Sequence, residues 1–204
     1  FPIYKRGSND PLAPGNYHGL SILPCIYKLY TSFLNLQINK FMEDDRFEDA
    51  QNGFRSGRSY QDHIFTMTSV IRNRLLKNED TFVAFIDFKK AFDLVNRDLL
   101  FVRLIDSGIN GKLYWAVKSL YKKPTSCVQV NDAFSDWFST SNGVKQGDAL
   151  SPTLFAIYIN SLITEIRNSG IGIRLGNSLL NILVYADDIA ICAKNEDDLQ
   201  ALLN

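Results

Sequence analysis

The sequence predicts an α+β fold, and three observations carry that prediction. An apolar run over residues 82–86 indicates a strand covered on both faces. Two short apolar runs, 182–184 and 189–192, flank a few polar residues and indicate an antiparallel hairpin. Segments with helical spacing lie before, between and after these strands, so helices and strands interleave along the chain.

Five segments have the features of helices, because apolar residues recur three and four positions apart within them. In the first segment, Ile26, Leu29 and Phe33 are among the apolar residues that recur at this spacing, and in the second, Ile64, Phe65, Met67, Ile71 and Leu75 are expected to form the inner face. Polar caps precede the second and third segments, and a proline stands in the first turn of the last, where its missing N–H is harmless. The expected helices span about 26–42, from Ser59 to about 75, from Asn96 to Gly108, 112–121 and from Ser151 to about Gly170.

Two further regions complete the expected order of elements. Residues 1–23 are rich in Pro, Gly and Asn and are expected to be extended or looped. Residues 127–130 and 137–139 are expected to pair as a second hairpin.

The composition bounds the function without identifying it. Of 204 residues, 46% are hydrophobic and 22% charged, which is typical of a globular protein. Lys plus Arg and Asp plus Glu number 22 each, so no overall charge points to a nucleic-acid partner. The three cysteines lack the spacing of a zinc site or a disulfide framework. No run approaches the ~18 apolar residues of a membrane span, so no membrane partner is expected.

The chain starts at Phe1 rather than at a methionine and stops at Asn204, within a segment expected to begin a helix. These ends indicate a piece of a longer protein.

The most informative stretch is Tyr185-Ala186-Asp187-Asp188, at the expected tip of the hairpin. Two adjacent carboxylates repel each other unless a cation neutralises them, which indicates a divalent-metal site. A solvated turn is the alternative, because Asp is common in turns.

A third carboxylate strengthens the metal interpretation. Asp87 follows directly after the strand at 82–86. If that strand and the hairpin are neighbours, Asp87, Asp187 and Asp188 meet at one edge of the sheet. Carboxylate oxygens suit Mg²⁺, and two such ions can activate an attacking hydroxyl and stabilise a leaving pyrophosphate. The arrangement therefore favours phosphoryl transfer.

Five sequence blocks then resemble, in order, those of reverse transcriptases, and the upstream two are similar to non-LTR (LINE-type) retrotransposon enzymes in particular. They are 16–23 (Asn-Tyr-His-Gly-Leu-Ser-Ile-Leu), 51–59 (Gln-Asn-Gly-Phe-Arg-Ser-Gly-Arg-Ser), 84–93 around Asp87, 145–152 around Gly147, and 185–188. The resemblance implies the fingers and palm of a right-hand polymerase, with an antiparallel palm sheet, packed helices and no thumb. Fingers are expected over residues 1–80. The palm is expected over 81–204, truncated before its remainder and the thumb, in one reverse transcriptase domain overall.

The resemblance also implies a metal set. Asp87 and Asp187 would hold two Mg²⁺ ions, with Mn²⁺ as a substitute. Asp188 would be an acidic partner, and the backbone carbonyl of Phe88 a further ligand.

Three residues would contact the incoming nucleotide. Phe92 matches the family's steric gate, a ring that rejects ribonucleotides by clashing with the 2′-hydroxyl. Gln146 and Gly147 would lie along the nascent base pair, where glycine permits close backbone approach. The alternatives are a core phenylalanine and an ordinary loop glycine.

Five residues would contact nucleic acid. Arg55 and Arg58 resemble fingers residues that contact template or primer phosphates, since guanidinium forks fit phosphate oxygens. Lys5 and Arg6 resemble a basic pair near the template, and Tyr185 would pack beneath the primer terminus. Surface charge and a plain hairpin aromatic are the alternatives.

The implied function is RNA-directed DNA polymerisation by a mobile element, with an RNA template, a DNA primer and dNTPs as partners. The implied location is intracellular, in the nucleus at the site of integration, and the oligomeric state is left open. One departure is His18, where the family has an Arg expected to grip the triphosphate; neutral His is a poorer anion ligand.

Three alternatives remain. A viral RNA polymerase typically has Gly before its Asp pair and lacks a bulky gate, so Ala186 and Phe92 argue against it. A group II intron reverse transcriptase shares more of the motifs. A catalytically inactive remnant that retains RNA binding is the third.

Overall fold

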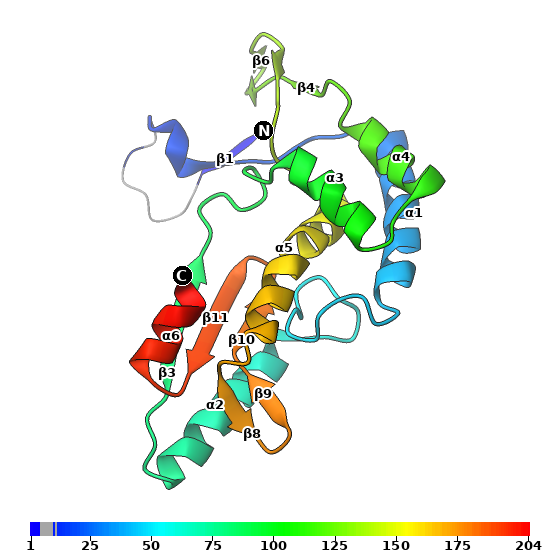
Figure 1. Cartoon of the computed structure of the whole chain (residues 1–204). Helices are drawn as coiled ribbons and strands as arrows, with labels where there is room; N and C mark the ends of the chain where they lie inside the picture. Colours follow the sequence, from blue (N-terminus) through cyan, green and yellow to red (C-terminus); the bar gives the residue numbers. More distant parts are fainter. Residues whose placement is uncertain (5–9, 11) are drawn as a thin grey trace. The chain divides into compact units, whose positions relative to one another are not determined.

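The computed structural model describes residues 1–4, 10 and 12–204, and Lys5 and Arg6 lie outside the described residues. Helices and antiparallel strands interleave along the chain, which confirms the predicted α+β class (Figure 1). The chain packs as two compact units, Phe1–Phe41 with Phe92–Phe155, and Met42–Ala91 with Ala156–Asn204. The division into fingers and palm at residue 80 stays a prediction.

The second unit is built on a three-stranded antiparallel sheet in the order β10–β11–β3. Its strands are β3 (Phe82–Asp87), β10 (Ile182–Tyr185) and β11 (Asp188–Ala193). Because side chains alternate along a strand, the register gives the sheet two distinct faces. One of them is apolar and includes the buried side chains of Ile182, Val184, Ile189 and Ile191.

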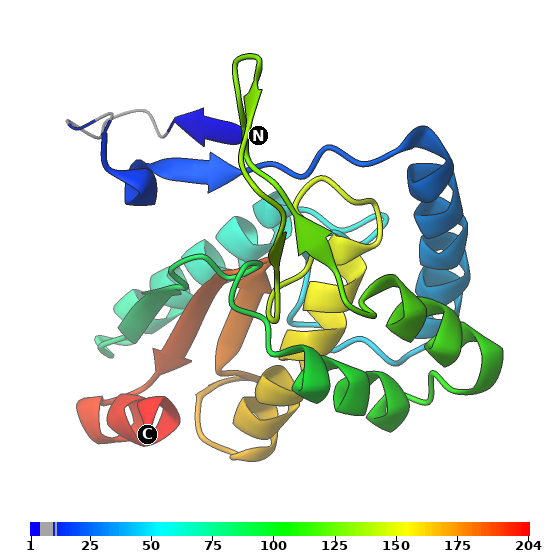
Figure 2. The ribbon, with the colours of Figure 1, turned by 90° about the horizontal axis from the view of Figure 1, so that it is seen from above.

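Helices α2 (Tyr60–Leu76) and α6 (Glu196–Leu203) lie on opposite faces of this sheet (Figures 1 and 2). A hairpin of β8 (Ile173–Leu175) and β9 (Ser178–Leu180) completes the unit, together with the later turns of α5 (Ser151–Asn168). Under α2, one small core joins the helix, the hairpin and the sheet. Its buried members are Val70, Ile173 and Cys192.

The prediction of a central strand at 82–86, covered on both faces, is wrong. β3 pairs only with β11 within the described sheet, which makes it an edge strand there. Phe85 at its middle is 80% exposed. A continuous apolar run indicates a strand but does not reveal how many neighbours it has.

The first unit holds the remaining helices and several short strand pairs. β1 (Pro2–Tyr4) pairs with β2 (Tyr17–Gly19). β4 (Thr125–Ser126) pairs with β7 (Phe138–Ser139), and β5 (Gln129–Val130) pairs with β6 (Ala133–Phe134). Both predicted segments contain strand residues, but their predicted pairing with each other is wrong, because each pairs with a different neighbour. The other elements are a 3-10 turn (Pro14–Asn16), α1 (Cys25–Met42), α3 (Arg97–Asp106), α4 (Gly111–Leu120) and the first turns of α5.

The helix boundaries follow the predicted caps. Ser59 and Asp62 form a capping box at the start of α2. The Asn96 side chain accepts a hydrogen bond from the Leu99 N–H at 3.0 Å at the start of α3. Gly108, at φ +87, follows the end of α3, where left-handed backbone favours glycine.

The predicted inner face of α2 is only partly correct, because Ile64, Phe65 and Leu75 are exposed. The apolar residues that recur along α1 are likewise only partly buried. Leu34 and Ile38 are buried, whereas Ile26, Leu29 and Phe33 are exposed. Helical spacing identifies residues that share a face, but not how much of that face another element covers. None of the described helices is long and apolar enough to cross a membrane.

Candidate active site

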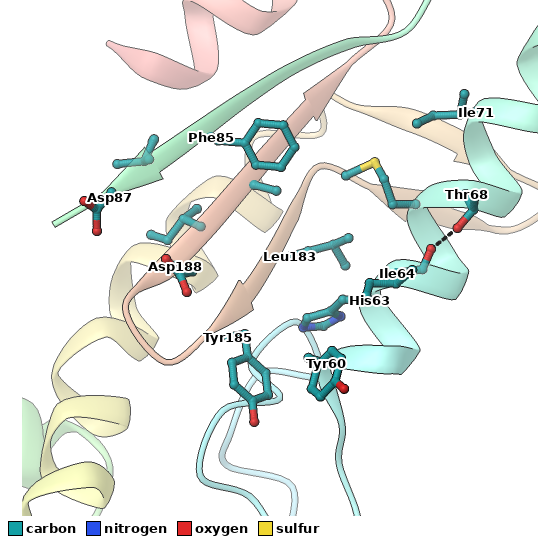
Figure 3. Close-up of a pocket in the computed structure, with 14 residues that line it drawn as sticks. Tyr60, His63, Ile64, Thr68, Ile71, Phe85, Asp87, Leu183, Tyr185 and Asp188 are labelled. Atoms are coloured by element: carbon teal, nitrogen blue, oxygen red, sulfur yellow. Dashed lines mark hydrogen bonds between the residues drawn. The ribbon is translucent and has the colours of Figure 1, made fainter. Parts of the chain in front are cut away.

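The candidate site lies at the end of the sheet in the second unit, where β3 ends and β11 begins. Asp87, the last residue of β3, is the direct cross-strand partner of Asp188, the first residue of β11. Residues opposite each other in an antiparallel pair project from the same face, with Cβ atoms roughly 4.5–5.5 Å apart. Both side chains are exposed and lie at the same end of the sheet (Figure 3). The predicted meeting of these two acids is confirmed.

Asp187 stands in the turn between β10 and β11. Tyr185 pairs with Asp188, so Ala186 and Asp187 form a two-residue connection. Ala186 has φ +60, in the left-handed region that residues with a Cβ atom rarely adopt. Ala186 is buried and Asp187 half-buried, so the turn is packed against the protein rather than projecting freely into solvent.

The turn is held by a buried amide. Gln51 Oε1 accepts hydrogen bonds from the Ala186 N–H at 3.1 Å and the Gly53 N–H at 2.7 Å. Gln51 Nε2 donates to the Ala186 carbonyl at 3.3 Å. A Cβ atom added to Gly53 would lie 2.1 Å from the Ala186 nitrogen, which explains glycine at this position. Both residues belong to the 51–59 block, for which only Arg55 and Arg58 were assigned roles from the sequence.

The same segment pairs with β10 through its backbone. The Asn52 N–H donates to the Val184 carbonyl at 2.9 Å, and the Val184 N–H donates to the Ala50 carbonyl at 2.8 Å. His63 Nε2 lies 3.0 Å from the same Val184 carbonyl. Residues 50–52 therefore act as a short additional strand beside β10, reaching the start of the turn.

The three acids have no cationic partner in the part of the chain that the structure describes. None of the ion pairs there involves Asp87, Asp187 or Asp188. Like charges directly opposite each other in a sheet are destabilising, so a bound cation would relieve the repulsion between Asp87 and Asp188. No three His, Cys, Asp or Glu side chains are gathered as a metal site among the described residues. The predicted metal set therefore stays a prediction.

A largely apolar groove of about 530 Å³ runs from the acids along the sheet towards α2. Tyr185 lies on its wall, and its ring meets that of Tyr60 edge to face at 6.1 Å (Figure 3). Phe85 and Leu183 also line it. The exposed Tyr185 ring therefore lies beside Asp188, and its contact with a primer terminus stays a prediction.

The two arginines of the 51–59 block have different environments. The Arg55 side chain is 6% exposed and its guanidinium binds the Glu43 carboxylate, with Nη2 at 2.8 Å from Oε2. Its Nη1 donates to the Glu48 and Gln51 carbonyls at 3.0 and 3.2 Å. Because these protein groups occupy the Arg55 guanidinium, the structure argues against its predicted contact with a phosphate. Arg58 is half-exposed and pairs with the exposed Asp49 at 2.7 Å, so it remains accessible.

Phe88 follows Asp87 directly, with an exposed side chain, and the role of its carbonyl stays a prediction.

The predicted gate, Phe92, belongs to the first unit. Its ring stacks on that of Phe155 at 4.8 Å with an interplanar angle of 19°. The core alternative therefore has structural support, while the gate stays a prediction.

Gln146 and Gly147 belong to a loop that contacts other residues of the first unit. The Gln146 carbonyl accepts a hydrogen bond from the Ser21 N–H at 2.8 Å. Gly147 has φ +96, and an added Cβ would lie 3.0 Å from the Ser21 carbonyl oxygen. Glycine is thus favoured by its backbone conformation and by the close approach of Ser21, while the predicted approach of Gly147 to the nascent base pair stays a prediction.

Buried ionisable residues flank that loop, and sequence reasoning did not single them out. Lys145 Nζ donates to the Tyr27 hydroxyl at 3.0 Å, and Asp148 is buried nearby. Burial lowers the pKa of Lys145 and raises that of Tyr121 to about 12. Burial, followed by the charge of Asp148, raises the pKa of Tyr27. Anchoring on both sides fixes the position of the Gln146–Gly147 loop.

The fold and the paired acids together define a polymerase palm-type domain, and comparison with known proteins identifies the family. Residues 3–204 match the family described as reverse transcriptase (RNA-dependent DNA polymerase). The chain belongs to this family, whose members in general depend on divalent metal ions.

Curated relatives come from mobile elements. The chain is 25% identical to the Pol polyprotein of the type-2 retrotransposable element R2DM of Drosophila melanogaster, over 94% of this chain and 18% of that protein. It is 27% identical to the RNA-directed DNA polymerase of the mobile element jockey of Drosophila funebris, over 95% and 20%. The chain thus spans about a fifth of these relatives. They confirm the resemblance to non-LTR retrotransposon enzymes.

Solved structures share the fold. Apo telomerase from Candida tropicalis, truncated from its C-terminal domain, superposes with a TM-score of 0.60 at 18% identity, over 87% of this chain and 36% of that one. Telomerase from Candida albicans in complex with a fragment of telomeric RNA superposes with a TM-score of 0.61 at 13% identity, over 87% and 32%. The predicted polymerase fold is confirmed.

Proposed function

We propose that the protein containing this chain is the RNA-directed DNA polymerase of a mobile element. The observation that supports this most directly is the pairing of Asp87 with Asp188, beside Asp187, in a chain of the reverse transcriptase family. The 3′-hydroxyl of a DNA primer attacks the α-phosphate of a dNTP chosen by an RNA template. A phosphodiester bond forms and pyrophosphate leaves.

The metal ions are part of the proposal. Two Mg²⁺ ions, or Mn²⁺ as a substitute, would neutralise the phosphate charge and activate the primer hydroxyl when bound. Asp87 and Asp187 would hold them, with Asp188 and the Phe88 carbonyl as additional oxygen donors. The carboxylates of Asp87 and Asp188 are exposed and that of Asp187 is half-buried, and none has a cationic partner in the described chain, which fits this role because Mg²⁺ prefers oxygen ligands.

The remaining roles concern substrates. Phe92 would exclude ribonucleotides, and Gln146 and Gly147 would border the nascent base pair. Arg58, with Lys5 and Arg6, would contact phosphates, and Tyr185 would support the primer end. The half-exposed state of Arg58 and the position of Tyr185 beside the acids support these roles. We also propose a nuclear location, at the site where the element integrates.

Primer extension with the longest reading frame that contains this chain tests the proposal. With an RNA template, a DNA primer, dNTPs and Mg²⁺, we expect extended product that disappears when a chelator is added. A catalytically inactive remnant would bind the template and primer without extending them. That result would contradict the proposed activity.

A further inference from the structure

We propose that Gln51 is a positioning residue for the reaction proposed above: its side-chain amide fixes the Ala186–Asp187 turn and thereby the Asp187 carboxylate. The catalytic consequence depends on the proposed function, whereas the hold on the turn can be tested separately.

The contacts are those of a clamp on one residue. The Gln51 amide binds both the backbone N–H and the backbone carbonyl of Ala186, at 3.1 and 3.3 Å. Gln51 is 0% exposed, so water does not compete for these hydrogen bonds. The two backbone groups of Ala186 are thereby held in a fixed orientation.

The turn needs such a hold because its conformation is intrinsically disfavoured. Ala186 has φ +60, where its Cβ approaches the carbonyl oxygen. Without the clamp, the Tyr185–Asp188 strand pair would be left to oppose relaxation to the common right-handed or extended conformations. Because Asp187 is the next residue, relaxation would move its carboxylate.

Nothing else in the described structure fixes Asp187 directly. Its side chain makes no hydrogen bond or ion pair with the described residues, so the backbone of the turn sets its position. Gly53 also lies against the turn, where an added Cβ would lie 2.1 Å from the Ala186 nitrogen. The 51–53 segment is therefore shaped to the turn.

The test compares Gln51→Ala with wild type in the longest reading frame that contains the chain. Misplacing a reacting group by about 1 Å costs about 10²-fold in rate, so we expect kcat for RNA-templated primer extension to fall by about that factor. KM for the dNTP should change less than kcat, because the variant alters the alignment of the reacting groups and not the residues proposed to border the nucleotide. Amide hydrogen exchange at Ala186 and Asp187, measured by NMR or mass spectrometry, should accelerate.

Asn181→Ala is the matched control. Asn181 is also a buried amide of the second unit, 2% exposed, and it donates to the Ile166 and Ile171 carbonyls at 2.7 and 3.0 Å. It should lose stability without faster exchange at the turn and without the selective fall in kcat. Adding Ala186→Gly to Gln51→Ala should restore part of kcat, because glycine adopts φ +60 readily.

Three results would overturn the proposal: unchanged exchange at the turn in Gln51→Ala, an equal fall in kcat in Asn181→Ala, or a double variant as impaired as the single one. If the wild-type protein does not extend primers, the proposed function has failed. The exchange comparison then decides the role of Gln51 by itself.

Discussion

Asp87 and Asp188 are direct cross-strand partners in the antiparallel β3–β11 pair. Their chain segments are remote in sequence, and the register places their carboxylates on one face of the sheet. Two facing like charges are unfavourable for folding in the absence of a cation. The arrangement is therefore suited to a function that brings positive charge to this end of the sheet.

The repulsion itself can be measured. Asp188→Asn should raise the free energy of unfolding by about 0.2–1 kcal/mol in a chelating buffer, because it removes one of two facing charges. Millimolar Mg²⁺ should reduce that gain. Asp132→Asn, at an exposed position between β5 and β6, is the control and should change little. Thermal or urea unfolding gives the values, and a gain that Mg²⁺ leaves unchanged would contradict the interpretation.

Gly53 should not tolerate even a methyl group. In Gly53→Ala the new Cβ would meet the Ala186 nitrogen at 2.1 Å, and backbone does not move aside as a side chain does. We expect a loss of stability of about 1–3 kcal/mol or more, the range for overpacking. Gly19→Ala is the control, because nothing lies within 4 Å of its added Cβ. Equal urea midpoints for the two variants would refute the close contact.

Substitution of Arg55 should mainly lower stability, whereas substitution of Arg58 should mainly weaken RNA binding. The Arg55 side chain is buried whereas that of Glu43 is partly exposed, so Arg55→Ala should destabilise by about 1–3 kcal/mol, the cost of leaving hydrogen-bonding groups without their partner. Arg58→Ala breaks a surface pair and should change stability by about 0–1 kcal/mol.

For RNA binding, Arg58→Ala should have the larger effect of the two variants. Arg58→Ala should weaken binding and make it less dependent on salt, since one phosphate contact is lost. Fluorescence anisotropy over a salt series measures this. An Arg58→Ala variant with the wild-type salt slope would remove Arg58 from the interface.

Phe92 should control the choice of sugar. Phe92→Ala should raise the relative use of ribonucleotides by about 10–200-fold, the range for one steric contact. Phe155→Leu is the control, because it disturbs the same ring stack at 4.8 Å without shortening Phe92. Competing rNTP and dNTP incorporation gives the ratio. If both variants change it equally, packing rather than a gate governs the selectivity.

Local sequence patterns predicted the elements and the main acids. Caps such as Ser59 and Asn96 and the apolar runs around Asp187 depend on neighbouring residues, so the helices and the hairpin were found from sequence. The contact of Gln51 with Ala186 joins residues 135 positions apart, and no local pattern encodes it.

Burial was the other property that the sequence did not reveal. Arg55 has the residue type of a phosphate ligand, but its pairing with Glu43 depends on how the loop folds back. Likewise, the apolar pattern of residues 82–86 is the same for a central strand and for the edge strand with exposed Phe85.

The most direct test of the central claim is primer extension by the longest reading frame that contains this chain, carrying Asp187→Ala. The account predicts loss of extension on an RNA template with Mg²⁺, while circular dichroism and the unfolding midpoint show that the fold is retained. Extension at the wild-type rate by this folded variant would contradict the carboxylate-dependent polymerase site.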